Sequence, residues 1–403
     1  MKTVLERFLT YVKLDTQSDE TTGLHPSTAK QLVLARLLAE ELTETGLAGT
    51  LLTEKGYVYA ALPASPGCED APAVGFIAHL DTSDAVSGRD VRPRVVTRWD
   101  GSPIPLGDSG ILLKPEPHLA GHDLVVTDGT TLLGADDKCG IAVIMSALEE
   151  IIEKKLPHGK ICVGFTPDEE IGQGADFFDV ERFGAKYAYT VDAGPENEIE
   201  YENFNAASAA VTFQGVSIHP GYAFGVMVNA LKMARTFDAL LPESEVPERT
   251  RGREGFYHLT RCSGTPERAE LHYILRDHDA GRFEARKKTI LDLCGRFDRQ
   301  YGPGRVSAVI RDQYRNMAEV MKDHPFVVEA AREAMKEVGL EPSSPPIRGG
   351  TDGARLCFMG LPCPNIGHGG YNAHSRSEYA DVRGMETAVR VLLGIVTRFS
   401  LEK

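Results

Sequence analysis

The sequence predicts an α/β fold with a mostly parallel central sheet flanked by helices, and a smaller inserted domain of βαββαβ order. In the first half of the chain, short apolar runs alternate with segments whose apolar residues recur at helical spacing. Near Asn205 this alternation ends, and the order of the elements changes. The length of 403 residues also exceeds what one hydrophobic core usually serves, which favours two domains.

The elements of the first half predict the parallel sheet. Helical spacing of apolar residues predicts helices at Val4–Val12, Ser27–Glu44 and Gly140–Lys154. Short apolar runs predict strands at Val74–Leu80, Ile161–Phe165 and Tyr187–Val191. Strands that alternate with helices in this way are typical of α/β domains whose sheet is largely parallel.

The elements after Asn205 predict a separate unit. They are a strand at Ala209–Phe213, a helix at Val226–Leu241, strands at Gly255–Arg261 and Glu270–Leu275, a helix at Ala280–Phe297 and a strand at Val306–Ile310. This is the order of a split-βαβ, ferredoxin-like unit. A helix at Pro325–Val338 follows, so we expect the main domain to comprise residues 1–205 and 317–403, with residues 206–316 inserted.

Composition and charge exclude several classes of function. Fifty-eight acidic and 44 basic residues give a net charge of −14, which argues against a nucleic-acid or anionic-membrane surface. No segment approaches the roughly 20 apolar residues of a membrane helix, and the first residues lack the apolar region of a signal peptide. The 7 cysteines form no CxxC pair, so neither a disulfide framework nor a thiolate zinc site is expected. We expect a cytoplasmic protein.

Polar residues that can bind metal follow three of the apolar runs. They are His79 and Asp81 after the first run, Asp168, Glu169 and Glu170 after the second, and Asp192 after the third. A further motif, LLGADDKCG, places Asp136 and Asp137 just before a helix. Because ligands gather at the carboxyl ends of strands in open α/β sheets, we expect these residues to converge.

Taken singly, each of these residues is also common in an ordinary structural role. His79 and Asp81 project from one face of a strand, so His79 would bind metal while Asp81 accepts its other ring N–H; alone, the pair is as typical of a solvated strand end. In the same way, Asp136–Asp137 is typical of a helix cap, Glu169–Glu170 of a surface pair, Asp192 of a turn and His374 of a loop. Their joint occurrence, three of them after apolar runs, favours a metal site.

Longer motifs resemble a known family. TLLGADDKCGIAVIM, FTPDEEIGQGA, YTVDAG, ENFNAASA, GVMVNAL, EGFYHL, PIRGGTDGA and GLPCPN are similar to the peptidase T family of tripeptide aminopeptidases. That family belongs to a di-zinc superfamily that also holds aminoacylases, bacterial carboxypeptidases and succinyl-diaminopimelate desuccinylases. The resemblance runs from about Leu5 to about Val396.

The resemblance implies a zinc-peptidase catalytic domain that binds two zinc ions, with cobalt or manganese as substitutes. It makes His79, Asp136 and Asp192 the ligands of one ion, and Asp136, Glu170 and His374 the ligands of the other. Asp136 would bridge the two. Three carboxylates and a bridging hydroxide balance the four positive charges of two zinc ions, and each ion keeps a position for water.

The resemblance also implies roles in catalysis. Glu169 would be the general base that takes a proton from the attacking water and passes it to the leaving amine, and Asp81 would orient His79. The zinc ions would lower the pKa of the water and stabilise the oxyanion.

The inserted domain would act as a lid that contributes substrate contacts. His219 resembles a family histidine that helps hold the oxyanion, in related enzymes from a partner subunit, so a homodimer is compatible with the sequence. Asn229, Arg276 and Arg348 resemble contacts to the substrate carboxylate, which a guanidinium grips with two parallel hydrogen bonds. Such an arginine would favour tripeptides over long chains. For Arg276 the alternative is a surface ion pair.

The sequence departs from the family pattern at two places. Cys139 stands where small residues are usual, and would lie beside Asp136, where a thiol is open to oxidation or to a soft metal ion. The residues SRSEY after His374 are less basic than expected.

Within the superfamily the alternative functions are those of a dipeptidase, a carboxypeptidase or an N-acyl-amino-acid amidohydrolase. Outside it, the alternative is a non-catalytic zinc-binding protein, which has no need of Glu169.

Overall fold

The chain forms two compact units in the computed structural model, which describes residues 2–402. Unit 1 comprises Met1–Tyr201, Glu319–Pro345 and Thr351–Lys403, and unit 2 comprises Glu202–Ala318 and Pro346–Gly350. The sequence-based boundaries had placed residues 346–350 in the main domain. They lie in unit 2 because Ile347 pairs with the first residues of that unit. The Ile347 N–H donates to the Glu202 carbonyl oxygen at 2.9 Å.

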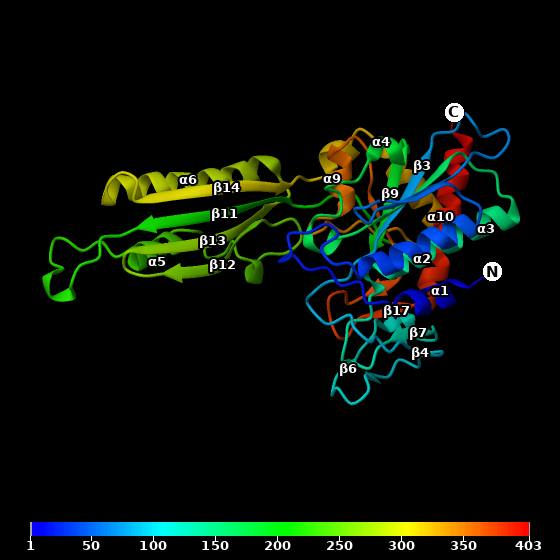
Figure 1. The fold of residues 1–403 in the computed structure, drawn as a ribbon, viewed down its shortest axis with the longest axis horizontal. Helices are drawn as coiled ribbons and strands as arrows, with labels where there is room; N and C mark the ends of the chain where they lie inside the picture. Colours follow the sequence, from blue (N-terminus) through cyan, green and yellow to red (C-terminus); the bar gives the residue numbers. More distant parts are fainter. Residues whose placement is uncertain (1, 403) are drawn as a thin grey trace. The chain divides into compact units, whose positions relative to one another are not determined.

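A seven-stranded sheet forms the centre of unit 1 (Figure 1). Its order is β1 (Ala48–Leu52), β2 (Val58–Leu62), β8 (Ile161–Thr166), β3 (Val74–His79), β9 (Tyr187–Ala193), β15 (Asn365–Gly367) and β10 (Ile199–Glu200). The four strands β8, β3, β9 and β15 are parallel to one another, whereas β1, β2 and β10 pair in the antiparallel sense. The predicted α/β class with a parallel central sheet is therefore confirmed.

Helices cover this sheet. They are α1 (Val4–Tyr11), α2 (Gln31–Glu44), α3 (Ala135–Lys154), α4 (Val180–Phe183), α8 (Pro325–Glu337), α9 (Asp352–Phe358) and α10 (Val382–Leu401), with a short α7 (Ala318–Met321). Helix α3 packs on β3 and β9, and α1 and α10 pack on α3. Gly140 permits the close approach of α3 to β9, because a Cβ at this position would overlap the Val191 carbonyl oxygen.

A second, antiparallel sheet of unit 1 was not expected from the sequence. Its order is β16 (Gly370–Tyr371), β17 (Tyr379–Asp381), β7 (Leu124–Val126) and β4 (Arg94–Val96), beside a two-stranded ribbon of β5 (Ile104–Pro105) and β6 (Leu112–Leu113). Its strands are only two or three residues long, too short to give an alternating pattern. The sheet matters for the site, because residues 372–378 form the loop between β16 and β17.

Unit 2 contains a four-stranded antiparallel sheet with two helices. Its elements in chain order are β11 (Asn205–Gln214), α5 (Ala230–Asp238), β12 (Phe256–Gly264), β13 (Arg268–Asp277), α6 (Ala280–Tyr301) and β14 (Val306–Tyr314). The strand order is β12-β13-β11-β14. Phe213, Phe237 and Phe297 are buried at the centre of its core. The chain order of these elements is the βαββαβ order that the sequence predicts.

Several element boundaries differ from the predictions. Helix α2 begins at Gln31 rather than Ser27, because the Ser27 backbone and side chain bond to Asp168 instead of starting the helix. Helix α3 begins five residues earlier than expected, and α5 is shorter at both ends than Val226–Leu241. Helix α10 was not expected from the sequence.

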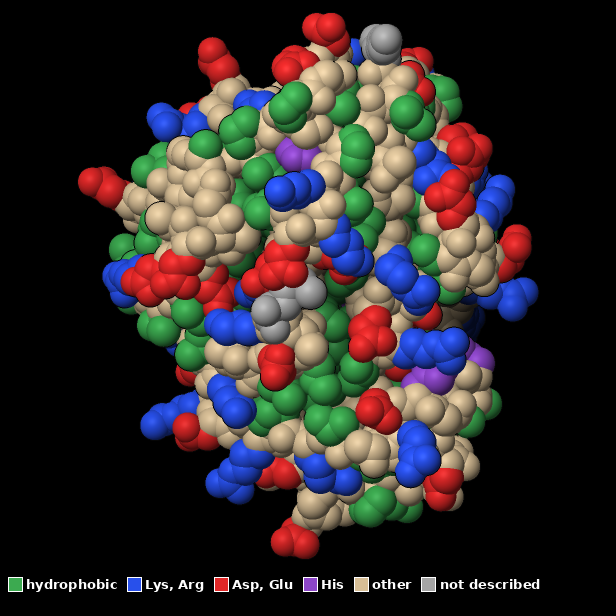
Figure 2. All heavy atoms as spheres, turned by 90° about the vertical axis from the view of Figure 1, so that its right-hand side faces the viewer, with side chains coloured by type: hydrophobic (Ala, Val, Ile, Leu, Met, Phe, Trp, Pro, Cys, Tyr) green, Lys and Arg blue, Asp and Glu red, His purple; other side chains and the backbone are tan. Residues whose placement is uncertain are grey.

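The lengths of the helices and the distribution of surface charge concern contact with membranes and nucleic acids. Among the described residues, no helix has the length and apolar character needed to cross a membrane. On the face drawn in Figure 2, acidic and basic side chains are interspersed. Mixed charge of this kind does not form a field of one sign.

Candidate metal centre

The parallel strands of unit 1 bring the sequence-predicted residues to one edge of the sheet. Strand β3 ends at His79, β8 ends three residues before Glu169, and β9 carries Asp192 near its end. Because β8, β3 and β9 are adjacent and parallel, their carboxyl ends meet at the same edge. Asp136 and Asp137 lie in the first turn of α3, which packs on β3 and β9.

Asp136 lies between two histidines from distant parts of the chain. Its Oδ1 is 2.8 Å from Nε2 of His79, and its Oδ2 is 3.0 Å from Nε2 of His374. His79 Nε2 also lies 3.4 Å from Oδ1 of Asp192, and His374 Nε2 lies 2.8 Å from Oε2 of Glu170. All five residues named as ligands from the sequence thus form one continuous cluster, with Asp136 at its centre.

A second grouping of the cluster replaces Asp136 by Asp137. His79, Asp137 and Asp192 have ligand atoms within 4.8 Å of one another, as do His79, Asp136 and Glu170. We favour Asp136, because the Asp137 carboxylate already accepts the backbone N–H of His79 at 3.0 Å and that of Gly140 at 3.2 Å. The Asp137 side chain is also fully buried, whereas that of Asp136 is 21% exposed.

Electrostatics show that the cluster attracts positive charge. Burial lowers the pKa of His79, but Asp192, Asp136 and Asp81 outweigh that effect and raise it well above its usual value. Hydrogen bonds to Asp136 and Glu170 raise the pKa of His374 to about 11. Burial and the charge of Asp136 raise the pKa of Glu170 to about 7. Clustered carboxylates that raise the pKa of neighbouring imidazoles create a negative potential. A divalent cation is stabilised by such a potential.

The residues of the cluster fit a pair of zinc ions. The donor set consists of two imidazole nitrogens and the carboxylates of Asp136, Glu170 and Asp192, which are oxygen and nitrogen ligands that zinc accepts. Oε1 of Glu170 is buried and has no hydrogen-bond partner among the described residues. An oxygen that coordinates a cation is expected to lack such a partner. The two divergent oxygens of Asp136 suit a bridging role.

Asp81 contacts the turn that carries Glu169 and Glu170. Its Oδ1 accepts the Glu169 N–H at 3.0 Å and its Oδ2 accepts the Glu170 N–H at 3.1 Å. Nδ1 of His79 lies 3.0 Å from the Asp81 carbonyl oxygen and 3.3 Å from Oδ1. The sequence suggested that Asp81 accepts the other ring N–H of His79, and both its carbonyl oxygen and its Oδ1 lie near that nitrogen. The Asp81 carboxylate also holds the turn.

Glu169 lies in the short turn after β8, among acidic residues of the cluster. Burial, followed by the charge of Asp192, raises the pKa of Glu169 well above its usual value. Its neighbour Asp168, fully buried, has a left-handed backbone conformation with φ 60°. Asp168 accepts the Ser27 N–H at 2.7 Å, the Ser27 hydroxyl at 2.5 Å and Nε2 of Gln31 at 2.6 Å. These contacts were not foreseen, because residues 27–31 lie about 140 positions away and carry no local sign of the pairing.

Two more buried residues of the site were missed from the sequence. Glu378, in the SRSEY segment, accepts three backbone N–H groups from residues 133–136. His368 is 3% exposed, and its Nδ1 accepts the Gly370 N–H at 3.0 Å. Burial lowers the pKa of His368 to about 4, so this imidazole is neutral at pH 7. Its Nε2 lies 3.5 Å from Oδ1 of Asp137.

Cys139 is inert in its surroundings. The side chain is fully buried, and burial, followed by the charges of Asp137 and Glu378, raises the pKa of its thiol well above the usual value. A protonated, inaccessible thiol is neither a good metal ligand nor readily oxidised. The reactivity considered from the sequence is therefore not favoured.

The four substrate-contact residues named from the sequence all lie in unit 2. Arg276 donates to the carbonyl oxygens of Ala207 and Leu275 at 3.3 and 3.0 Å, and to Oε1 of Gln313 at 3.2 Å. These acceptors are uncharged, unlike the acidic partner that a surface ion pair would need. The Arg276 guanidinium also lies 5.2 Å from the centre of the Tyr314 ring.

The other three make local contacts. Arg348 donates to the carbonyl oxygens of Gly252 and Glu254 and to the Thr250 hydroxyl, so three of its hydrogen bonds hold residues 250–254. Asn229 caps α5 by accepting the Lys232 N–H at 3.2 Å. His219 is exposed, and its Nδ1 accepts the Gly221 N–H at 3.2 Å.

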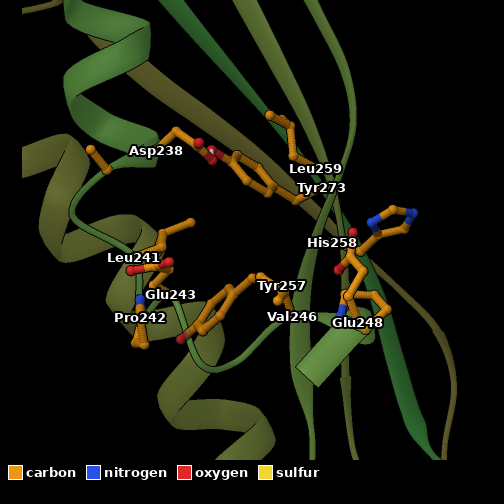
Figure 3. A pocket seen from close by; sticks show the side chains of 12 residues that line it. Asp238, Leu241, Pro242, Glu243, Val246, Glu248, Tyr257, His258, Leu259 and Tyr273 are labelled. Atoms are coloured by element: carbon orange, nitrogen blue, oxygen red, sulfur yellow. Dashed lines mark hydrogen bonds between the residues drawn. The ribbon is translucent and has the colours of Figure 1, made fainter. Parts of the chain in front are cut away.

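Two cavities differ in their relation to the cluster. One, of about 240 Å³, lies in unit 1; its lining combines small residues with Asp136, Asp192, His368, Tyr371, Asn372 and Glu378. The other, of about 420 Å³, lies in unit 2 between α5 and the β12–β13 pair, where Figure 3 shows Tyr273 beside Asp238 and Tyr257 beneath. None of the site residues predicted from the sequence lines the cavity in unit 2. The smaller cavity, beside the carboxylates of the cluster, is therefore the one relevant to the candidate metal centre.

The chain is similar to known peptidases in sequence and in fold. The model of Peptidase family M20/M25/M40 matches residues 121–398. A protein named Peptidase T from Clostridium perfringens (strain SM101 / Type A) is 50% identical over 403 residues, covering 98% of each chain. The crystal structure of aminopeptidase PepT from Bacillus cereus ATCC 10987 has a TM-score of 0.80 and 23% identity, covering 98% of each chain. Bacillus subtilis YXEP, described as a dinuclear metal binding peptidase, has a TM-score of 0.66 and 13% identity over 98% of this chain and 97% of that one.

Proposed function

The chain belongs to peptidase family M20/M25/M40, and from this premise we propose that it is a metal-dependent aminopeptidase that releases the N-terminal residue of tripeptides. The relative from Clostridium perfringens carries the name Peptidase T at 50% identity across almost the whole chain. The observation that carries the proposal is Asp136, whose two carboxylate oxygens face His79 and His374 separately. Such an arrangement supports two metal ions that share one carboxylate.

We propose zinc as the metal, with His79, Asp136 and Asp192 as ligands of one ion and Asp136, Glu170 and His374 as ligands of the other. When bound, the zinc pair supplies an activated water and polarises the scissile carbonyl. Cobalt or manganese substitute, because imidazole and carboxylate ligands suit all three metals. The buried, unpartnered Oε1 of Glu170 supports this assignment.

Glu169 is the general base in this proposal. It takes a proton from the attacking water and transfers it to the nitrogen of the leaving dipeptide, so that one carboxylate serves both steps. Its adjacency to Glu170 keeps it beside the cluster while leaving its own carboxylate free. Asp81 orients the turn that carries both residues through their backbone N–H groups.

Unit 2 supplies substrate contacts in this proposal. Arg276 presents a guanidinium whose protein partners are neutral oxygens, so that it keeps its charge for the C-terminal carboxylate of a tripeptide. His219, Asn229 and Arg348 are secondary candidates, and the capping role of Asn229 and the loop contacts of Arg348 account for part of their bonding.

The test compares free tripeptides with N-acetylated tripeptides, dipeptides and longer peptides. We expect hydrolysis of free tripeptides with release of the N-terminal residue, and little hydrolysis of the acetylated series. Cleavage of only the acetylated peptides would assign the chain to the amidohydrolases of the superfamily instead. Release of the C-terminal residue would assign it to the carboxypeptidases, and hydrolysis of dipeptides alone to the dipeptidases. Zinc binding without hydrolysis of any peptide would indicate a non-catalytic protein.

Two further properties complete the proposal. A reducing compartment, the cytoplasm, is consistent with the 7 cysteines, all of which are free thiols in the structure. A homodimer formed through unit 2 stays a prediction, which the mass of the protein in solution tests.

A further inference from the structure

Glu378 is a buried carboxylate that contacts the loop ahead of Asp136. The residue is 1% exposed and follows His374 by four positions. Its Oε2 accepts the backbone N–H groups of Leu133 and Gly134, both at 2.7 Å, and its Oε1 accepts the N–H of Asp136 at 3.0 Å. One side chain therefore bonds three amides within a four-residue stretch.

These amides lie where the backbone has no regular bonding pattern. The first N–H groups of a helix have no intrahelical partner, and α3 begins at Ala135. Gly134 has a left-handed conformation with φ 79°, and Asp136 and Asp137 depart from helical dihedral angles. Secondary structure therefore does not determine the path of this stretch. The three hydrogen bonds to Glu378 supply the constraint, and a carboxylate is also the favourable charge at a helix N-terminus.

The loop that carries Glu378 also carries His374. This loop, between β16 and β17, is closed by its own hydrogen bonds: Ser375 Oγ donates to the Asn372 carbonyl oxygen at 2.7 Å, and the Glu378 N–H donates to the Ser375 carbonyl oxygen at 3.3 Å. The spacing between His374 and Glu378 is thereby restricted. Because Glu378 holds the backbone of Asp136 and His374 faces its Oδ2 at 3.0 Å, the position of Asp136 relative to His374 depends on Glu378.

We propose that Glu378 is a positioning residue for the metal pair: it holds residues 133–136 so that the two oxygens of Asp136 face different ions. The inference rests on the proposed di-metal function. Both carboxylate oxygens of Glu378 accept backbone N–H groups of residues 133–136. Its effect passes through the backbone to the carboxylate of Asp136.

The test is Glu378→Gln, which keeps the shape of the side chain. A glutamine offers one acceptor oxygen, and its NH₂ group would face an N–H of the loop, so at least one of the three bonds is lost. We expect the affinity for zinc, measured by competition with a chelating dye, to fall by about 10- to 100-fold. We expect kcat on a tripeptide to fall similarly, with KM changed less than about twofold. Glu386→Gln, at an exposed glutamate of α10, is the matched control and should behave as the wild-type protein.

A purely structural role has a different signature. Glu378→Gln would then lower the melting temperature of the metal-free protein, while zinc affinity and kcat of the folded protein stay at wild-type values; that result would overturn the inference. If the variant does not fold, hydrogen exchange of the metal-free wild-type protein decides: amides 133–136 should exchange as slowly as the centre of α3, and rapid exchange would refute the contact. If the wild-type protein binds no zinc, the proposed function is wrong. The hydrogen-exchange result still tests the contact between Glu378 and residues 133–136, because it is measured without metal.

Discussion

The side chain of Gln31 forms two hydrogen bonds with Asp168, one in each direction. Nε2 of Gln31 donates to Oδ1 of Asp168 at 2.6 Å, and Oε1 of Gln31 accepts the Asp168 backbone N–H at 3.1 Å. Asp168 immediately precedes Glu169, so this pair connects the first residue of α2 to the turn that holds the candidate base. A pair of bonds with opposite polarity fixes both the side chain and the backbone of Asp168.

Gln31→Ala should therefore lower turnover without abolishing metal binding. The change leaves a buried carboxylate and a buried amide short of partners, which costs about 1–3 kcal/mol of folding stability per group. A shift of the turn by a fraction of an ångström to 1 Å is expected to lower kcat by about 10- to 100-fold. Steady-state kinetics on a tripeptide and zinc analysis check this. Glu40→Ala, at an exposed position of α2, is the control; equal kcat in both variants would speak against a positioning role.

Glu169→Gln is expected to keep zinc and lose catalysis. The amide has nearly the shape of the carboxylate but accepts no proton from water. We expect kcat to fall by at least about 100-fold, the lower range for the loss of a general base, at unchanged zinc content. Metal analysis beside single-turnover kinetics checks both parts. Wild-type turnover in this variant would remove Glu169 from the mechanism.

Removal of metal should inactivate the protein reversibly. A chelator in excess competes for the ions, and zinc, cobalt or manganese added after its removal should restore hydrolysis. The clustered carboxylates lose their counter-charges at the same time, so the melting temperature should fall with the metal. Activity that survives in protein shown to be metal-free would contradict the proposed site.

Arg276→Lys should weaken recognition of the substrate carboxylate. Lysine keeps the charge but cannot form two parallel hydrogen bonds with a carboxylate. We expect KM for a tripeptide to rise about tenfold, and the preference of the wild-type protein for a free carboxylate over a C-terminal amide to shrink. Arg311→Lys, at an exposed position on strand β14 of the same sheet, is the control. An undiminished preference would mean that another residue binds the carboxylate.

His368 should make the stability of the metal-free protein depend on pH. Its pKa is about 4 in the folded protein, because burial disfavours the charged imidazole, against about 6.5 when unfolded. As the pH falls below 6.5, the unfolded state binds the proton first. The free energy of unfolding therefore decreases until about pH 4, by about 3 kcal/mol at roughly 1.4 kcal/mol per pH unit. Above pH 6.5 both states are neutral and the contribution is constant.

Urea unfolding of wild-type protein and of His368→Gln between pH 7 and pH 4 measures this contribution. Glutamine does not titrate, so the variant should lose about 3 kcal/mol less than the wild-type protein over that range. Parallel pH profiles for the two proteins would show that His368 is not responsible.

The residues at the strand ends could be predicted because their signal is local. His79 ends β3 and Asp192 lies near the end of β9, while Asp81 follows β3, and Glu169 and Glu170 follow β8. The rule that parallel strands present their carboxyl ends together needs no knowledge of the rest of the chain. The inserted unit could be predicted for the same reason, since its long strands and amphipathic helices carry their own periodicity.

The supports of the site could not be predicted in this way. Glu378 bonds residues about 240 positions earlier, and Gln31 bonds a residue 137 positions later. Neither has a sequence pattern that distinguishes it from an exposed polar residue. The short strands β16 and β17, which position the loop of His374, are also too brief to leave a periodic signal.

By itself, the sequence predicted which side chains could hold metal, which strand ends carry them, and an inserted unit from residue 206, four positions after unit 2 begins at Glu202. Only the tertiary structure decided that Asp81 bonds the backbone N–H groups of Glu169 and Glu170, that Gln31 bonds Asp168, and that Glu378 holds the loop of Asp136. The physical reason is the range of the interactions. Periodicity and strand order follow from neighbours along the chain, whereas the direction of a buried carboxylate depends on whichever distant amides the packed fold brings within about 3 Å.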